Sequence, residues 1–263
     1  MADNGPETRT ASPRPKAPGG DRHRPASGGL VHQARRRLSG FRRFGGRVLA
    51  AAGLRPARPR ASMSTEYFEA LYAADPDPWN FTDSGNEYEA RKYAATLAAL
   101  PRPNYAAALE VGCSIGVLTA ELAPRCGSLL SIDAAAAPLA AARERTAGFP
   151  QVKVRQARVP EDWPEGRFEL ILISEVLYFF TPEDLRRLAE RAAAALVPGG
   201  DIVLVHWTGP SEFPLTGDAA VEGFRAALGG AAAPLRQERA EQWRLDVLRR
   251  TVDGSPAAAA ARP

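Results

Sequence analysis

The chain is poor in the residues that build covalent or metal-linked scaffolds. It has two cysteines, two methionines and three histidines in 263 residues. Two cysteines in a chain of this length do not make a disulfide framework. No group of Cys and His residues has the spacing of a metal site. The sequence therefore predicts no resident metal and a fold held together by an ordinary hydrophobic core.

Long apolar runs are also missing. No stretch of about 18 apolar residues occurs, so the sequence predicts no membrane span. The N-terminal part lacks the long apolar segment of a secretory signal. With the scarcity of cysteine, these absences predict a cytoplasmic protein. The Gly-x-Ser-x-Gly turn of serine hydrolases and the Gly-Lys-Ser/Thr phosphate loop are absent too, which argues against both enzyme classes.

Charge is divided unevenly along the chain. The formal net charge is +4. Residues 1–60 contain thirteen arginines, one lysine and three acidic residues, a charge of +11 that leaves −7 for the remainder. Because a surface that binds nucleic acid needs an excess of positive charge, the acidic remainder predicts no nucleic-acid partner.

The composition predicts a disordered basic leader over residues 1–61, a folded domain over 62–252 and a disordered tail over 253–263. Within the leader, residues 29–54 interleave apolar residues with arginine, so a helix lying on an anionic membrane surface is an alternative to a solvated tail. Gly40, Gly45 and Gly46 in that segment oppose a stable helix. A further hypothesis is that translation starts at Met63.

Apolar periodicity predicts alternating helices and strands in the domain. The first helix follows Ser64, which can cap it, and ends before Pro76. Later helices are predicted at 86–100, 117–125, 137–147, 182–197, with Pro198-Gly199-Gly200 as terminator, and 217–228. Strands are predicted at 106–112, 128–133, 152–157, 168–174 and 201–207, and in a hairpin of 236–243 with 244–250. This order predicts a Rossmann-like α/β fold with a mostly parallel seven-stranded sheet, helices on both faces, an N-terminal helical cap and a C-terminal antiparallel hairpin.

One segment combines the features of a ligand-binding turn. Residues 109–116, Leu-Glu-Val-Gly-Cys-Ser-Ile-Gly, follow a predicted strand and open a predicted helix. Its small residues let the backbone approach a ligand, and its N–H groups point at that ligand. Asp133 ends the next strand, where a carboxylate can accept both hydroxyls of a ribose. The third glycine of the dinucleotide fingerprint is missing, which favours a nucleoside without phosphates over NAD.

Candidate reacting groups lie at the ends of two later strands. Ser174 and Glu175 end the fourth strand, and His206 lies near the end of the fifth, at the carboxyl edge where open α/β sheets bind ligands. A carboxylate or an imidazole there can hold and deprotonate an amine, so Glu175 and His206 are candidate bases, and Tyr178 is a candidate orienting hydroxyl. The alternative for His206 is a packed histidine with no chemical role.

Glu110-x-Gly112-x-x-x-Gly116, Asp133 and the strand 168–174 resemble the class I S-adenosylmethionine-dependent methyltransferases. Over about residues 64–250 the chain is similar to the nodulation protein S (NodS) family, which N-methylates the free terminal amine of a deacetylated chitooligosaccharide. The segments that carry this closer resemblance are Tyr67-Phe68, Asp-Pro-Trp-Asn-Phe at 77–81, Tyr-Glu-x-x-Lys-Tyr at 88–93, Pro-Glu-Asp-Trp-Pro at 160–164 and Ser-Glu-Val-Leu-Tyr at 174–178.

The resemblance implies S-adenosylmethionine as cofactor. The implied cofactor-binding residues are Trp79, Tyr88, Arg91, Glu110, Gly112, Cys113, Gly116, Asp133, Ala134, Val159 and Ser174. Glu110 and Gly112 would line the methionine part, Ala134 and Val159 would flank the adenine, and Arg91 would pair with the cofactor carboxylate. Relatives usually carry Gly-Asp at 157–158. Arg158 offers no acceptor to the adenine amino group, so a weaker cofactor affinity is expected.

These observations favour a methyltransferase that acts on a small molecule, with an amine of an amino sugar or glycoconjugate as the first acceptor. One alternative is an O-methyltransferase for a sugar or polyketide hydroxyl. Another is a non-catalytic S-adenosylmethionine-binding protein, with Arg158 as a sign of decay. A nicotinamide-dependent oxidoreductase is disfavoured by the glycine pattern.

Overall fold

The computed structural model describes residue 1 and residues 57–83 and 85–252. The described residues from 57 onward belong to one compact unit. Most of the predicted leader and all of the predicted tail at 253–263 lie outside the described residues, so the hypotheses on the leader remain predictions. No helix in the described part of the chain is long and apolar enough to cross a membrane.

The sheet has seven strands in the order β3-β2-β1-β4-β5-β7-β6. Strands β1 to β5 run parallel to one another, and β7 pairs antiparallel with both β5 and β6. The strands are β1 Ala108–Val111, β2 Leu129–Asp133, β3 Val152–Gln156, β4 Phe168–Ser174, β5 Leu196–Trp207, β6 Ala232–Arg239 and β7 Trp243–Arg250. The predicted fold class is confirmed. The strand order, which pattern alone does not reveal, runs outward in opposite directions from the parallel pair β1 and β4, so the switch point of the sheet lies between these two strands.

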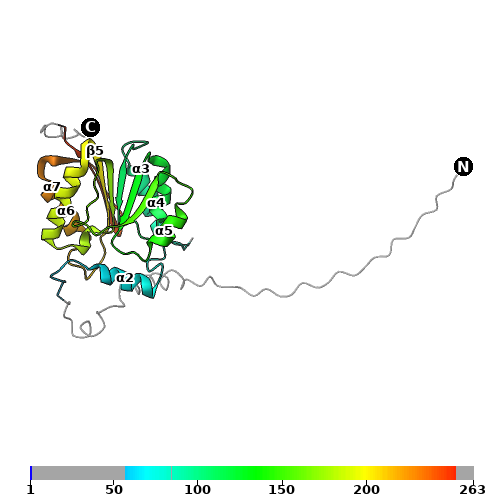
Figure 1. The fold of residues 1–263 in the computed structure, drawn as a ribbon, viewed down its shortest axis with the longest axis horizontal. Helices are drawn as coiled ribbons and strands as arrows, with labels where there is room; N and C mark the ends of the chain where they lie inside the picture. The colour runs from blue at the N-terminus through cyan, green and yellow to red at the C-terminus, as the bar shows by residue number, and fades with distance from the viewer. Residues whose placement is uncertain (2–56, 84, 253–263) are drawn as a thin grey trace. The chain divides into compact units, whose positions relative to one another are not determined.

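Helices cover both faces of this sheet (Figure 1). The α-helices are α2 Thr65–Ala74, α3 Glu87–Ala99, α4 Val117–Leu122, α5 Leu139–Arg145, α6 Pro182–Ala195 and α7 Gly217–Leu228. Short 3₁₀ turns are η2 Ala123–Arg125, η3 Leu177–Phe179 and η4 Gly229–Ala231. Residues of α6 and α7 pack in one core cluster, and residues of α3 and α4 pack in a second cluster on the other face.

Strand β4 shows why the sheet is buried on both sides. Ile171 and Ile173 belong to the core cluster under α6 and α7, whereas Leu170 and Leu172 belong to the cluster under α3 and α4. Successive side chains of a strand point to opposite faces, so a continuous apolar run fills both cores at once. The central position predicted for residues 168–174 follows from this pattern.

Helix α2 forms part of the predicted N-terminal cap. Ser64 caps it, since its hydroxyl accepts the Tyr67 N–H at 3.4 Å. The backbone N–H of Met63 donates to the carbonyl of Phe179 at 2.9 Å, which ties the start of α2 to the segment after β4. The cap therefore lies against loops at the carboxyl ends of the parallel strands.

Two predicted boundaries are wrong. Helix α6 ends at Ala195, and the predicted terminator Pro198-Gly199-Gly200 lies inside β5 instead. Leu196 pairs with Phe168, and the next pair joins Asp201 to Leu170, so the residues between them form a bulge. The C-terminal hairpin is also shifted, because β6 starts four residues before the predicted position 236 and Trp243 begins β7.

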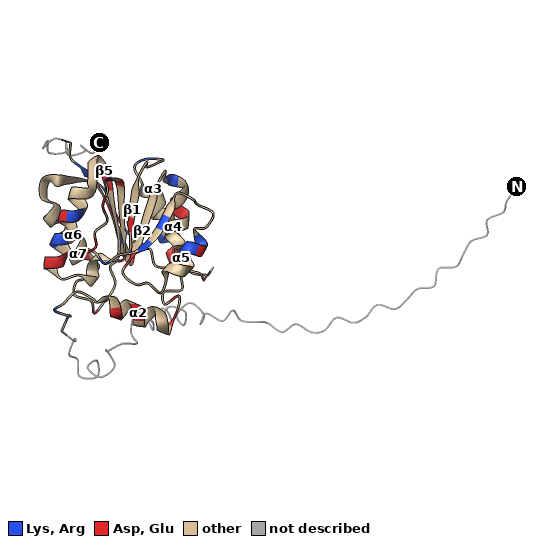
Figure 2. Cartoon of the chain, in the orientation of Figure 1, with Lys and Arg blue, Asp and Glu red and all other residues tan. Residues whose placement is uncertain are grey.

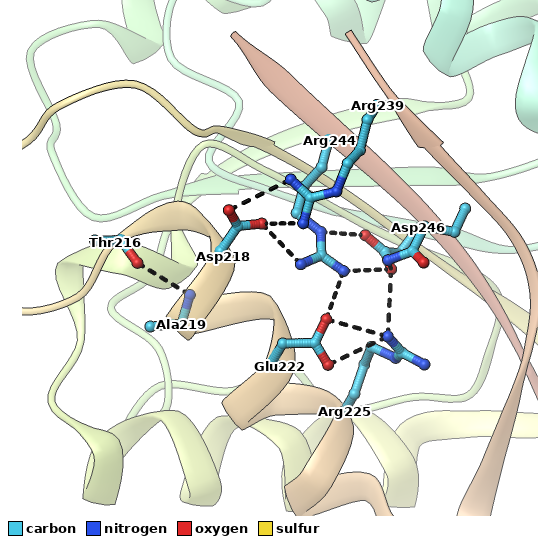
Figure 3. A network of polar contacts seen from close by, with 9 residues as sticks. Thr216, Asp218, Ala219, Glu222, Arg225, Arg239, Arg244 and Asp246 are labelled. Atoms are coloured by element: carbon cyan, nitrogen blue, oxygen red, sulfur yellow. Dashed lines mark hydrogen bonds and ion pairs between the residues drawn. The ribbon is translucent and has the colours of Figure 1, made fainter. Parts of the chain in front are cut away.

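A buried arginine joins the hairpin to helix α7 (Figure 3). The guanidinium of Arg244 donates to Asp246 at 2.8 and 2.9 Å, to Asp218 at 2.9 Å and to Glu222 at 2.8 Å. The Arg244 side chain is fully buried, and that of Asp246 is 2% exposed. Asp218 and Glu222 are 45% and 56% exposed, so the buried part of the cluster is the Arg244–Asp246 pair. A buried pair is costly to break from one side, because removing one partner leaves the other group without its ion pair.

Replacement of Arg244 tests this cluster. Arg244→Met is expected to lower the free energy of unfolding by about 3–5 kcal/mol, because the buried Asp246 carboxylate loses both hydrogen bonds from the guanidinium. Urea unfolding at neutral pH measures the change. The matched control is Arg186→Met, which removes an exposed ion pair with Glu190 on α6, a helix that carries both signs of charge (Figure 2). The control is expected to cost at most about 1 kcal/mol, and equal losses in the two variants would contradict the assigned role.

Candidate functional site

The turn after β1 has a backbone that only small residues tolerate. Gly112 and Gly116 have φ values of +86° and +77°. A Cβ on Gly112 would lie 2.3 Å from the Val176 side chain, and one on Gly116 would lie 2.8 Å from Cα of Ala142. Between them, Ser114 adopts a φ of +50°, which is uncommon for a residue with a side chain. The predicted glycine-dependent bend is therefore present.

Asp133 is held against this bend by backbone donors. Its Oδ2 accepts the Ser114 N–H at 2.9 Å, and its Oδ1 accepts the Ala135 N–H at 3.0 Å. Burial raises the pKa of Asp133, and these backbone hydrogen bonds offset part of that effect. A carboxylate has about four acceptor positions, so each oxygen keeps capacity for one hydroxyl of a ribose. The chemistry of this group fits the predicted sugar-binding role.

Helix α2 contacts both turns through residues that the sequence analysis missed. The Tyr72 hydroxyl donates to Oγ of Ser114 at 2.6 Å. The Glu69 carboxylate accepts the N–H groups of Ala136 and Ala137 at 2.6 and 3.2 Å, just after β2. The only feature of the sequence that pointed to these two residues was their spacing on one face of a helix. That spacing does not show which part of the protein the helix packs against.

The remaining predicted residues of the first turn are buried. Glu110 lies inside the sheet, where it accepts the hydroxyls of Thr119 and Ser131 at 2.7 Å each. Burial raises its pKa, and the two hydroxyls partly offset this. Cys113 is 4% exposed, and burial raises the pKa of its thiol well above the usual value. Glu110 thus ties β1 to β2 and α4, and Cys113 is held as a neutral thiol.

Glu175 stands at the carboxyl end of β4 in an unusual backbone conformation, with a φ of +58°. Its Oε1 accepts Lys92 Nζ at 2.7 Å, and its Oε2 accepts the Tyr178 hydroxyl at 2.9 Å and the Trp207 N–H at 2.8 Å. Burial, the largest single effect, would raise the pKa of Glu175, but the Lys92 charge, the neighbouring His206 and the hydrogen bonds from Lys92 and the Trp207 N–H together lower it. Positive φ at a polar residue is a form of strain that collects at functional sites.

Lys92 links Glu175 to a second carboxylate. Lys92 Nζ lies 3.0 Å from Oε1 and 2.9 Å from Oε2 of Glu89, one turn earlier on α3. Lys92 is 2% exposed and Glu89 is 8% exposed. Neither residue was predicted as a site residue. The available signal was their i,i+3 spacing on the same helix face as the apolar Tyr93, since charges on an apolar face must find partners.

His206 is fully buried and faces the turn after β4. Its Nε2 accepts the N–H groups of Leu177 at 3.1 Å and Val176 at 3.4 Å. Burial lowers the pKa of His206 to about 4 despite the nearby charge of Glu175. The imidazole is therefore neutral near pH 7, and its acceptor nitrogen is already used by the backbone.

The predicted cap residues differ in placement. Trp79 is half-buried. Its ring stacks on that of Phe81, with 5.6 Å between the ring centres, and meets the Tyr72 ring edge-on, with 5.5 Å between the centres. Tyr88 packs edge-on against Trp207 at 5.8 Å, so the cap reaches the end of β5. Arg91 is exposed on α3. The buried neighbour of Arg91 in sequence, Lys92, is the residue that points to Glu175, because consecutive helix positions face different directions.

The turns after β2 and β3 contain the residues expected at the adenine. Ala134 is half-buried, and its carbonyl accepts from Gln156 Nε2 at 3.0 Å. Val159 is 6% exposed. The exposed Arg158 side chain has no hydrogen-bond acceptor for an adenine amino group. Its backbone N–H donates to Oδ2 of Asp162 at 3.2 Å. A carboxylate is thus present beside this turn, four residues after the position where relatives usually have one.

Ser174 lies where the ends of β1 and β4 approach each other. Ser174 is 9% exposed, and its carbonyl lies 3.1 Å from where a Cβ on Gly112 would be, so the ends of β1 and β4 are in close approach. Among the described residues, no group of three or more His, Cys, Asp or Glu side chains is arranged to hold a metal ion.

This fold and this edge define the class I methyltransferase architecture, and known proteins match it. A Bradyrhizobium japonicum NodS N-methyltransferase, solved with S-adenosylhomocysteine, superposes with a TM-score of 0.62 at 23% identity, over 72% of this chain and 99% of its own. A Pseudomonas syringae protein provisionally described as a methyltransferase is 39% identical with a TM-score of 0.56, over 62% of this chain and 99% of its own.

The family model for nodulation protein S (NodS) matches residues 66–206, and the chain belongs to this family. Nodulation protein S of Rhizobium tropici is 34% identical over 133 residues, which are 50% of this chain and 55% of the relative. The chain thus spans about half the length of the curated relatives that it matches. The resemblance identified from the motifs is confirmed at the level of family and fold.

The neutral state of His206 has a measurable consequence. The unfolded chain protonates this imidazole near its ordinary pKa of 6.5, whereas the folded chain resists protonation down to about pH 4. The free energy of unfolding is therefore expected to fall as pH drops from 6.5 toward 4, by up to about 1.4 kcal/mol per pH unit from this group. Urea unfolding at several pH values should show a shallower pH dependence for His206→Gln than for the wild type. Equal slopes would contradict the buried neutral state.

Proposed function

We propose that the chain is an S-adenosylmethionine-dependent methyltransferase whose acceptor is an amine of a small molecule, first among them an amino sugar or glycoconjugate amine. The observation that carries the cofactor assignment is the Ser114–Asp133 hydrogen bond, which joins the glycine-dependent bend to a ribose-binding carboxylate. Family membership supports the assignment, as do the N-methyltransferase and S-adenosylhomocysteine named for a structural relative.

The residues present fit this cofactor. Asp133 has acceptor capacity for the ribose hydroxyls, and the Gly112–Gly116 bend brings backbone within reach of the methionine part. Ala134 and Val159 are proposed to flank the adenine, and Trp79 and Tyr88 to cover the cofactor from the cap. When bound, the sulfonium supplies an electrophilic methyl group with a neutral leaving group.

The exposed position of Arg91 weakens the predicted pairing of its guanidinium with the cofactor carboxylate. Asp162, beside the Arg158 backbone, is a carboxylate that can replace the missing adenine acceptor. Adenine recognition is thus assigned to the turn at 158–162, and the methionine carboxylate is left to backbone N–H donors of the Gly112–Gly116 bend.

The chain's own groups position the acceptor. We propose that Glu175 holds the acceptor amine near the end of β4, with Tyr178 orienting that carboxylate through its hydroxyl. His206 has no accessible lone pair in this arrangement, because Nε2 accepts the N–H groups that follow Glu175. We therefore propose that His206 supports the Glu175 turn, rather than acting as the base that the sequence suggested.

Calorimetry with S-adenosylhomocysteine tests the cofactor site. The wild type is expected to bind with a dissociation constant below 1 mM, that is, about −4 kcal/mol or better. Asp133→Asn is expected to weaken binding by about 10- to 100-fold, since hydrogen bonds to a charged group are worth about 1.5–3 kcal/mol. Glu144→Gln, an exposed charge removal on α5, is the matched control and should bind like the wild type. Absence of wild-type binding at millimolar ligand would refute the proposed cofactor.

Transfer of a radiolabelled methyl group to amino sugars, chitooligosaccharides with a free terminal amine and other small amines tests the acceptor class. Glu175→Gln is expected to lower the transfer rate at least about tenfold, because the acceptor loses a charge-assisted contact. The same variant should bind S-adenosylhomocysteine within about threefold of the wild type.

Each result of this assay has a defined meaning. Wild-type rates in Glu175→Gln would remove Glu175 from the mechanism. Label on a hydroxyl, and none on an amine, would replace N-methylation by O-methylation. Cofactor binding without transfer to any acceptor of the panel would support a non-catalytic protein.

A further inference from the structure

A buried lysine of the cap holds the Glu175 side chain. Lys92 lies on α3 and is 2% exposed, and its Nζ donates to Oε1 of Glu175 at 2.7 Å. The other oxygen of Glu175, Oε2, accepts the Tyr178 hydroxyl at 2.9 Å and the Trp207 N–H at 2.8 Å. Donors from α3, η3 and β5 therefore fix the orientation of this one carboxylate.

The carboxylate of Glu175 keeps capacity for one more donor. Oε2 accepts two hydrogen bonds, whereas Oε1 accepts one, from Lys92. A carboxylate has about four acceptor positions. The Glu175 side chain is 21% exposed, and that of Lys92 is 3% exposed. An N–H group of an acceptor can therefore bond to Oε1 while Lys92 stays in place.

Lys92 also supplies the positive charge that balances Glu175. The titratable groups that face Glu175 are Tyr88, Glu89, Lys92 and Tyr93 on α3, Tyr178 on η3 and His206 on β5. Of these described groups, only Lys92 is positively charged near pH 7, because burial lowers the pKa of His206 to about 4. A buried carboxylate without a cation beside it tends to take up a proton. The charge of Lys92 thus favours the ionised form of Glu175.

Stability alone is a weak reason for this ion pair. Apolar residues of similar volume are often as stabilising as a buried ion pair. The Lys92–Glu175 pair instead joins the cap to the end of β4, across 83 positions of the chain. A fixed, ionised carboxylate there can orient an amine through its N–H group and stabilise the positive charge that methylation places on the nitrogen.

We propose that Lys92 is a positioning residue for methyl transfer, which acts through Glu175 by holding this carboxylate ionised and oriented toward the acceptor amine. The inference rests on the proposed function, because that function assigns the acceptor amine to Glu175. In this role Lys92 touches neither the acceptor nor the cofactor.

A double-variant cycle on methyl transfer tests the proposal. The acceptor is a chitooligosaccharide with a free terminal amine, or the amine of the panel that the wild type methylates fastest. All variants carry Glu89→Gln, so that removal of Lys92 does not leave two facing carboxylates. In this background Lys92→Met is expected to lower kcat at least about tenfold, a barrier increase of about 1.4 kcal/mol, and to raise the KM for the acceptor.

The second arm of the cycle shows whether Lys92 acts through Glu175. When Glu175→Gln is also present, Lys92→Met should change kcat by less than about threefold, because the carboxylate on which Lys92 acts is gone. The matched control is Lys153→Met, which removes an exposed lysine on β3 and should leave kcat and both KM values unchanged.

Cofactor binding separates positioning from a general loss of structure. Helix α3 also carries Tyr88, which is proposed to cover the cofactor, so a loosened helix would weaken cofactor binding as well. Calorimetry should show that Lys92→Met binds S-adenosylhomocysteine within about threefold of its background. A tenfold loss of this affinity together with the loss of turnover would reduce Lys92 to a structural residue and overturn the proposal.

The remaining outcomes also decide the proposal. An unchanged kcat in Lys92→Met, or an equal fall with and without the Glu175 carboxylate, would overturn it. If urea unfolding shows that Lys92→Met is not folded, Lys92→Gln, which keeps an N–H donor but loses the charge, takes its place with the same expectations. If the Glu89→Gln background transfers no methyl group, the same cycle is measured with Glu89 intact.

The two levels of inference fail separately. A wild type that neither binds S-adenosylhomocysteine nor transfers a methyl group would contradict the proposed function, and the role of Lys92 with it. Wild-type transfer that does not depend on Lys92 would contradict only the positioning role.

Discussion

The hydrogen bond from the Ser114 N–H to Asp133 is the interaction on which the site depends. It requires the chain to turn sharply after β1, and the left-handed conformations of Gly112 and Gly116 allow that turn. Close packing enforces it, because a Cβ on either glycine would meet a neighbouring segment. The bend and the acid at the end of β2 therefore form one rigid unit, and Tyr72 fastens the cap to it.

The second half of the site depends on charge compensation among distant segments. Lys92 comes from the cap helix, Glu175 from the end of β4, and the N–H of Trp207 from the end of β5. None of these groups is stable alone in a buried position, since an unpaired buried charge is strongly unfavourable. Their mutual bonds hold the cap against the carboxyl edge of the sheet.

Much of the fold could be predicted from local sequence patterns. The boundaries that were predicted wrongly have physical causes. The apolar run 168–174 can satisfy two cores only as a central strand, and α6 follows from its cap and apolar stripe. The boundary at Pro198-Gly199-Gly200 was misjudged because these residues favour a turn locally, yet a bulge accommodates them within β5. Pairing with a distant strand overrode local preference there.

The α/β class, the glycine-dependent bend and the positions of Asp133 and Glu175 at strand ends could be predicted from the sequence, because each depends on backbone preferences or on where a strand ends. Three features could not be predicted from the sequence and emerge from the packed fold: His206 is neutral and bound to the backbone, Arg91 is exposed, and Lys92 joins Glu89 to Glu175. The reason is that protonation and charge pairing depend on which groups meet in space, and residues 83 positions apart in the chain meet in the Lys92–Glu175 pair.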